Sequence, residues 1–114
     1  MTLPAPIPPR TAQQELHRYV ELVWRALSAP DAELASARDA LRHRRCVVVQ
    51  MFDLLGSAHA RICIDEEGFS VEPGEPVPQG AAWVLSRRHV VDVIRRPQHY
   101  LTQPGRLDLG WLEV

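Results

Sequence analysis

Apolar residues in the first part of the chain recur at helical spacing. In residues 11–28 they share one face of a helical wheel, and this face comprises Ala12, Leu16, Tyr19, Val20, Val23 and Leu27. Thr11, with Gln14 three residues later, forms a capping-box pattern that satisfies free amides at a helix start. Residues 28–45 carry acids early and bases late, as the helix dipole favours. We therefore predict a helix over 11–28 and a second helix that ends near Arg44.

From Arg45 onward the pattern becomes that of β-strands. Residues 46–55, "CVVVQMFDLL", are β-branched and apolar, and residues 59–65, "HARICID", alternate between apolar and polar positions. Gly56 and Ser57 separate the two segments, which predicts a hairpin. A third strand follows at "FSVE", and a fourth at "AAWVLS" after a loop rich in proline and glycine.

The last third predicts one more helix and a closing strand. Ser86 can cap a helix over residues 87–96, and Pro97 stops it because proline cannot donate a hydrogen bond inside a helix. In residues 107–114, "LDLGWLEV", alternate apolar residues would share one face of a strand. This order predicts an α+β fold in which the N-terminal helices pack on a mainly antiparallel five-stranded sheet.

Composition indicates a single domain. The 114 residues are 46% hydrophobic and 24% charged, which suits one globular unit over residues 11–114. Residues 1–10, "MTLPAPIPPR", contain four prolines and predict a flexible, polyproline-like arm. No apolar run approaches the roughly 18 residues of a membrane span. Two cysteines, Cys46 and Cys63, are too few for a disulfide scaffold, so we expect both to be reduced and the protein to be cytoplasmic.

Charge and motifs exclude several classes of function. The net charge is −1, and the 13 basic residues, all arginine, are spread along the chain, so we expect no nucleic-acid partner. No P-loop, GxGxxG, GxSxG or HExxH motif occurs. The five histidines contain no pair at four-residue spacing. We therefore predict no metal site, no cofactor and no catalytic residue set.

The remaining candidate chemistry is apolar. Nine residues are expected to line an interior: Val23, Met51, Phe52, Phe69, Trp83, Val90, Ile94, Leu109 and Trp111. Such residues build either an ordinary filled core or a pocket for an apolar ligand. The sequence pattern alone leaves both alternatives open.

Residues 46–114 resemble the sterol carrier protein type-two domain family in the order of their elements. The shared order is a strand, a short turn, a second strand, "EEGFSVEPGEP" as third strand and loop, a strand entering a Ser-capped helix, and the segment "YLTQPGRLDLGW". The resemblance implies an α+β sandwich with an apolar tunnel for sterols, acyl chains or isoprenoids and no catalytic residues. Two features depart from the family: Gly110-Trp111 replaces its frequent Gly-Asp, and the chain ends at Val114 where the family commonly adds a tunnel-closing helix.

The function implied by this resemblance is non-catalytic binding of an apolar small molecule, such as a lipid, acyl chain, isoprenoid or polyketide. The protein would be a carrier or an accessory to a partner enzyme, with the nine interior residues as its ligand-binding set. One alternative is a small cone-shaped α+β cyclase or isomerase, with Asp53 or Asp92 and His89 as its candidate acid and base residues. Another is a dimeric interaction module with no small ligand.

Overall fold

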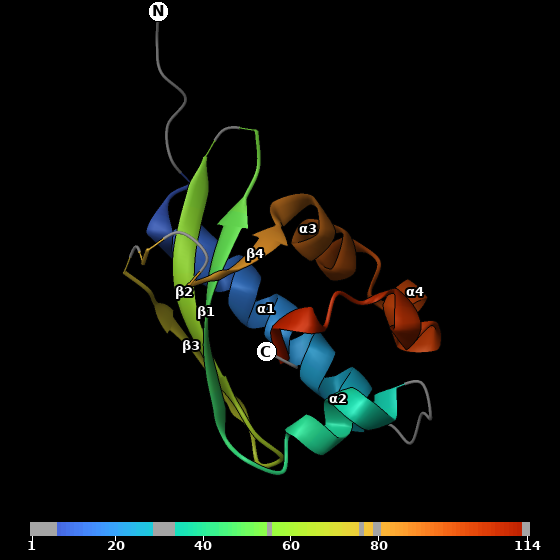
Figure 1. Cartoon of the computed structure of the whole chain (residues 1–114). Helices are drawn as coiled ribbons and strands as arrows, with labels where there is room; N and C mark the ends of the chain where they lie inside the picture. Colours follow the sequence, from blue (N-terminus) through green and yellow to red (C-terminus); the bar gives the residue numbers. More distant parts are fainter. Residues whose placement is uncertain (1–6, 29–33, 55, 76, 79–80, 113–114) are drawn as a thin grey trace, which may run out of the picture.

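The computed structural model of this chain describes residues 7–28, 34–54, 56–75, 77–78 and 81–112. Its elements, in chain order, are α1 (Pro9–Ser28), α2 (Ala35–Ala40), β1 (Arg45–Phe52), β2 (Ser57–Ile64), β3 (Phe69–Pro73), β4 (Trp83–Ser86), α3 (Arg87–Arg95), α4 (Pro97–Thr102) and the short 3-10 helices η2 (Pro104–Arg106) and η3 (Gly110–Leu112). Figure 1 shows this arrangement, with α3 and α4 lying to one side of the sheet. The general α+β class is confirmed.

The sheet has four strands in the order β3-β2-β1-β4 within the described part of the chain. β1 pairs antiparallel with β2, and β2 pairs antiparallel with β3. β4 instead runs parallel to β1, with Met51 opposite Leu85. The prediction of a five-stranded, mainly antiparallel sheet was therefore wrong, because the sheet is mixed and the expected closing strand is not one of its members.

The closing segment failed to form a strand because its apolar residues pack as turns. Trp111 and Leu112 are adjacent in the chain, and both are fully buried in η3. A strand covered on one face buries alternate residues, so two successive buried side chains do not fit one. The indole Nε1 of Trp111 also donates to the carbonyl of Asp108 three residues earlier, a contact that belongs to a turn. Residues 113–114 lie outside the described residues.

Helix α1 confirms the first helical prediction, and its six predicted face residues are 0% to 3% exposed. The helix begins at Pro9 rather than Thr11, since proline is tolerated in the first turn, where its missing N–H would have no partner. Ile7 just before it is also buried, at 4% exposed. Of the expected arm, Pro9 and Arg10 thus belong to the helix, and residues 1–6 lie outside the described residues.

The other helices differ in length from their predictions. α2 covers only Ala35–Ala40, and residues 29–33 of the segment predicted to be helical lie outside the described part. α3 ends at Arg95 as Pro97 requires, but the same proline then begins α4, a helix that the sequence pattern did not predict. Proline stops one helix and starts the next because its fixed backbone angle suits the first turn of a helix. Among the described residues, no helix has the length and apolar character to cross a bilayer.

In the described part of the chain, helices cover only one face of the sheet. On β1 the inward residues Val49 and Met51 are 0% exposed, whereas Cys46 and Phe52 on the opposite face are exposed. Strand β2 shows the same alternation, with Ile62 fully buried next to the exposed Arg61. Alternation of this kind is typical of a sheet whose second face meets solvent. We call this second side, away from the helices, the bare face.

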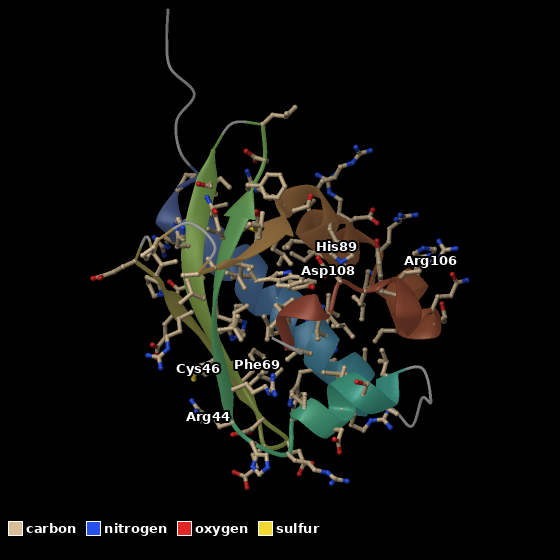
Figure 2. The ribbon with its side chains drawn as sticks, viewed as in Figure 1. Arg44, Cys46, Phe69, His89, Arg106 and Asp108 are labelled. Atoms are coloured by element: carbon tan, nitrogen blue, oxygen red, sulfur yellow. A yellow bond between two sulfur atoms is a disulfide. The ribbon has the colours of Figure 1, made fainter. Side chains whose placement is uncertain are left out.

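The two cysteines are joined in a disulfide, so the expectation that both are reduced was wrong. Cys46 and Cys63 lie directly opposite each other on β1 and β2, with their Cα atoms 4.1 Å apart. Figure 2 shows Cys46 on the bare face, while Phe69 lies on the side of the helices. The sequence gives the number of cysteines but not their register, which depends on where the hairpin turns. The cytoplasmic location stays a prediction.

The disulfide should contribute measurably to the free energy of unfolding. Its cysteines are 17 residues apart, and a loop of about 15 residues corresponds to about 3 kcal/mol in the chain-entropy model. We expect the free energy of unfolding of the double variant Cys46→Ser/Cys63→Ser, measured in urea, to be about 3 kcal/mol lower than that of the native chain. Its unfolding midpoint should not respond to a reductant, whereas that of the native chain should fall. Two thiols reacting in the unreduced, denatured protein would contradict the pairing.

Candidate functional site

The structure places the nine expected interior residues in two groups. Val23, Met51, Val90 and Trp111 are 0% exposed and belong to the core. Phe69, Trp83, Ile94 and Leu109 are partly buried and pack against it. Phe52 is the exception, since it lies on the bare face and is 42% exposed. The clefts along α3 and along α1 contain none of the nine among their described lining residues.

Trp83 shows how closely this core is packed beside β4. A Cβ atom added at Gly110 would overlap the indole ring of Trp83, so no larger residue fits there without a shift. The close packing of Trp83 therefore explains why position 110 is a glycine. The Nε1 atom of Trp83 is buried and has no hydrogen-bond partner among the described residues, an energetic cost that the packing must offset.

The backbone of Asp108 is the centre of a polar cluster. Its carbonyl accepts a hydrogen bond from the Tyr19 hydroxyl at 2.8 Å and one from Trp111 Nε1 at 3.0 Å. Its N–H donates to His89 Nε2 at 3.1 Å. Figure 2 shows His89 and Asp108 facing each other between α3 and the C-terminal segment. These bonds join α1, α3 and η3 around one residue.

The same bonds fix the chemical state of two side chains. Because His89 Nε2 accepts a hydrogen bond, the neutral ring carries its proton on Nδ1. Burial raises the pKa of the Tyr19 phenol, so this group stays protonated and remains a donor. Both side chains therefore hold the fold together in the positions they occupy.

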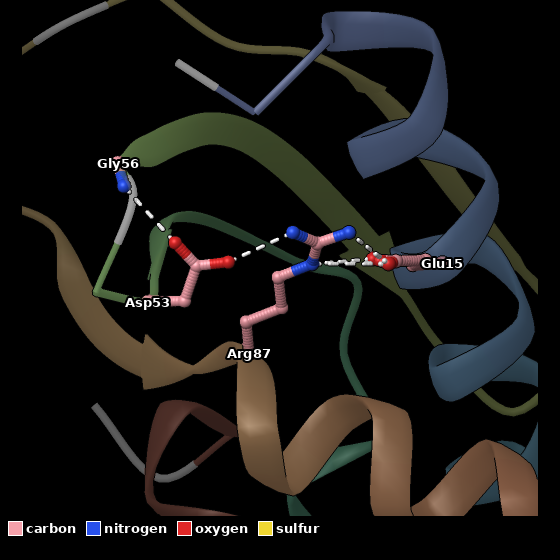
Figure 3. Close-up of polar contacts among 4 residues, drawn as sticks. All are labelled: Glu15, Asp53, Gly56 and Arg87. Carbon is pink, nitrogen blue, oxygen red and sulfur yellow. Dashed lines mark hydrogen bonds and ion pairs between the residues drawn. The ribbon is translucent and has the colours of Figure 1, made fainter. Parts of the chain in front are cut away.

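A second polar cluster joins α1, the β1–β2 hairpin and α3 through Arg87 (Figure 3). Its guanidinium donates to Glu15 at 2.7 Å and to Asp53 at 2.8 Å, and these two carboxylates raise the pKa of Arg87. Asp53 also accepts from the N–H of Gly56 at 3.0 Å, which closes the hairpin turn. All three charged side chains are at most one quarter exposed.

Asp92 is held by groups from α3 and α4. Arg96 donates to both of its oxygens, at 2.9 and 2.7 Å, and the Tyr100 hydroxyl donates at 2.5 Å. The bonds from Arg96 and Tyr100 lower the pKa of Asp92 to about 2. A carboxylate with such a pKa is a weak general base near neutral pH. In the cyclase alternative the candidates are Asp53, Asp92 and His89. Asp53 binds Arg87, whereas Asp92 and His89 both contact Tyr100 and line the same cleft along α3.

A polar cleft follows the outer side of α3 and was not anticipated from the sequence. Its volume is about 510 Å³. The described residues that line it are Ser86, Arg88, His89, Val91, Asp92, Arg95, Arg96 and Tyr100. The signal in the sequence was the seven-residue spacing of Arg88 and Arg95, which places both on one side of a helix whose other side is apolar. Among the described residues, no group of three or more histidine, cysteine or acidic side chains could hold a metal ion.

The bare face of the sheet is the other exposed feature. Phe52 is 42% exposed and Val84 is 54% exposed, and Leu54 just beyond β1 is fully exposed. On the same face, Arg61 of β2 lies directly opposite Glu72 of β3, and both are exposed. This face therefore combines apolar side chains with one charge of each sign.

Comparison with protein-family models, with curated proteins and with solved structures finds no match to this chain. The resemblance to the sterol carrier protein type-two family, and the lipid-binding role that it implies, therefore stay predictions.

The Asp108 cluster predicts a graded loss of stability. Trp111→Ala should lower the free energy of unfolding by about 3 to 5 kcal/mol, because it removes a fully buried aromatic side chain. Tyr19→Phe should cost only about 1 kcal/mol, since the Asp108 carbonyl keeps its bond from Trp111. Chemical denaturation of both variants tests this order. Equal losses would contradict the cluster as described.

The lowered pKa of Asp92 predicts a pH-dependent contribution to stability. The folded pKa, about 2, lies below the ordinary value of 3.8, so the ionised carboxylate stabilises the fold above about pH 4. That contribution is lost as the pH falls through the folded pKa. Asp92→Asn should therefore melt at a lower temperature than the native chain near pH 7, and the gap should close between about pH 4 and pH 2.

Thermal unfolding followed by circular dichroism across this pH range measures the gap. Asp39→Asn is the matched control, because among the described residues this carboxylate forms only an exposed ion pair with Arg42. A gap between native chain and Asp92→Asn that persists unchanged to pH 2 would contradict the assignment.

Proposed function

We propose that this protein is a non-catalytic interaction module that forms a homodimer through the bare face of its sheet. The observation that carries this proposal is the one-sided architecture: the helices cover one face, while the other presents Phe52 and Val84 to solvent. Exposed apolar patches bordered by polar residues are typical of protein–protein contact sites.

The apolar side chains of the bare face are neighbours. In the parallel pairing of β1 with β4, Val84 lies opposite Gln50, and Phe52 lies opposite Ser86. Phe52 and Val84 are therefore diagonal neighbours on one face, at the spacing from which side chains of adjacent strands touch. Leu54, two residues after Phe52, is a further exposed apolar residue near the end of β1. An aromatic side chain in such a group is a suitable centre for an interface.

The charges on this face favour a second copy of the same chain as the partner. A twofold axis brings each surface patch against itself, so residue i of one copy contacts residue j of the other, and the reverse. Arg61 and Glu72 provide one charge of each sign for such a reciprocal pair. A net charge of −1 gives little repulsion between copies.

The disulfide supports the same proposal. Cys46 and Cys63 fasten β1 to β2 on the bare face, so this part of the surface is already ordered before a partner arrives. A preformed surface loses less conformational entropy on binding than a mobile one. The expectation of an apolar small ligand stays a prediction, and eight of its nine residues are occupied in packing the core.

Sedimentation velocity over a concentration series tests the dimer. We expect the native chain to shift from monomer to dimer as its concentration rises into the micromolar range. Phe52→Glu should raise the dissociation constant about thirtyfold, which corresponds to the ~2 kcal/mol of a central interface aromatic. Gln98→Glu, at an exposed position on α4, is the control and should leave association unchanged.

A charge exchange makes the test specific for a twofold contact. Arg61→Glu alone should weaken the dimer, because two acidic side chains would then meet across the axis. The double variant Arg61→Glu/Glu72→Arg keeps both charges but exchanges their places, so it should regain most of the affinity. A native chain that stays monomeric at high micromolar concentration would overturn the proposal. So would a double variant no better than Arg61→Glu alone.

A further inference from the structure

The cleft along α3 has the size of a small-molecule site. Its volume of about 510 Å³ lies within the roughly 300 to 1,000 Å³ of known ligand pockets. It runs from Ser86, where α3 is entered, to Tyr100 on α4. Figure 1 shows α3 and α4 on the helical side of the molecule. At the start of α3 the cleft reaches Ser86, which lies opposite Phe52 in the sheet.

The charges of the cleft do not cancel. Three arginines and one carboxylate line it. The carboxylate of Asp92 is matched by Arg96, which holds both of its oxygens. Arg88 and Arg95 remain, and among the described residues neither makes a hydrogen bond or an ion pair. The cleft therefore carries an excess of two positive charges.

The two free guanidinium groups can reach one ligand. Arg88 and Arg95 are seven residues apart on α3, which is two turns or roughly 10 Å along the axis. Their long, exposed side chains can converge from both ends of the cleft. His89 lies between them in the lining, and its Nδ1–H is a further donor because its Nε2 is occupied by the Asp108 N–H.

We propose that this cleft binds the phosphate group of a small phosphorylated molecule through Arg88 and Arg95, with His89 as an additional donor. A phosphate monoester carries about −1.5 to −2 charges at neutral pH and three acceptor oxygens, which match two guanidinium groups and one N–H. A single carboxylate would match only one of the two charges. The volume of the cleft leaves room for the organic part of the ligand beside Val91.

Isothermal titration calorimetry tests the site with inorganic phosphate, glycerol phosphate and adenosine monophosphate, at constant ionic strength in chloride. Neutral glycerol is the control ligand. We expect all three phosphates to bind and glycerol not to bind. Tighter binding of adenosine monophosphate than of glycerol phosphate would assign a nucleotide. Equal affinities would assign recognition of the phosphate group alone.

Matched double variants distinguish specific phosphate binding in the cleft from nonspecific attraction to the positive charge of the protein. Arg88→Gln/Arg95→Gln should weaken binding about tenfold for each arginine, as expected for lost charge-assisted hydrogen bonds. Arg18→Gln/Arg25→Gln removes the same charge from α1, where both arginines pair with Glu21, and should leave binding unchanged. Thermal unfolding checks that both double variants are folded.

Three results would overturn the proposal: no binding of any phosphate at millimolar concentration, unchanged binding in Arg88→Gln/Arg95→Gln, or an equal loss in the control pair. The dimer test has a different readout and changes different residues, Phe52, Arg61 and Glu72. Failure of one proposal therefore leaves the other intact.

Discussion

The packing of the C-terminal segment depends on the backbone polar groups of Asp108. This segment lies over the core as short turns, so it does not have the ladder of hydrogen bonds that a fifth strand would have supplied. Buried backbone groups need partners, and here side chains provide them. Tyr19 and Trp111 satisfy the Asp108 carbonyl, and His89 satisfies its N–H. Arg45 satisfies the carbonyl of Leu112 at 2.6 Å.

One turn of α1 carries both polar connections to α3. Glu15 binds Arg87 at the start of α3, and Tyr19, four residues later, reaches the Asp108 group to which His89 is bonded. Residues four apart lie on the same side of a helix, so α1 is connected to α3 at two points that are one helical turn apart. The inner side of α3 is thereby fixed, whereas Arg88 and Arg95 on its outer side make no such contacts with the described residues.

The sequence was sufficient to predict elements whose apolar period is regular. The α1 face, the β1–β2 hairpin and α3 all formed where periodicity placed them, because burial of a regular apolar stripe determines each one. The prediction of a closing strand over residues 107–114 was wrong. The spacing of Leu107, Leu109 and Trp111 is compatible with both a strand and a series of turns, and only the hydrogen-bond partners of their backbone groups distinguish the two. Nor could spacing reveal that Arg87 would find both Glu15 and Asp53, which depends on how α1, the hairpin and α3 come together.

The position of the disulfide has a consequence for how the hairpin can misfold. If β1 slipped by one residue against β2, every side chain of the strand would turn to the other face, and Phe52 would exchange places with Met51. A covalent bond between Cys46 and Cys63 permits only the pairing in which these two residues are opposite. The disulfide therefore holds the register of β1 against β2 even when the hairpin partly unfolds. The two strands can then pair again in the native register, because shifted registers are not accessible to the oxidised chain.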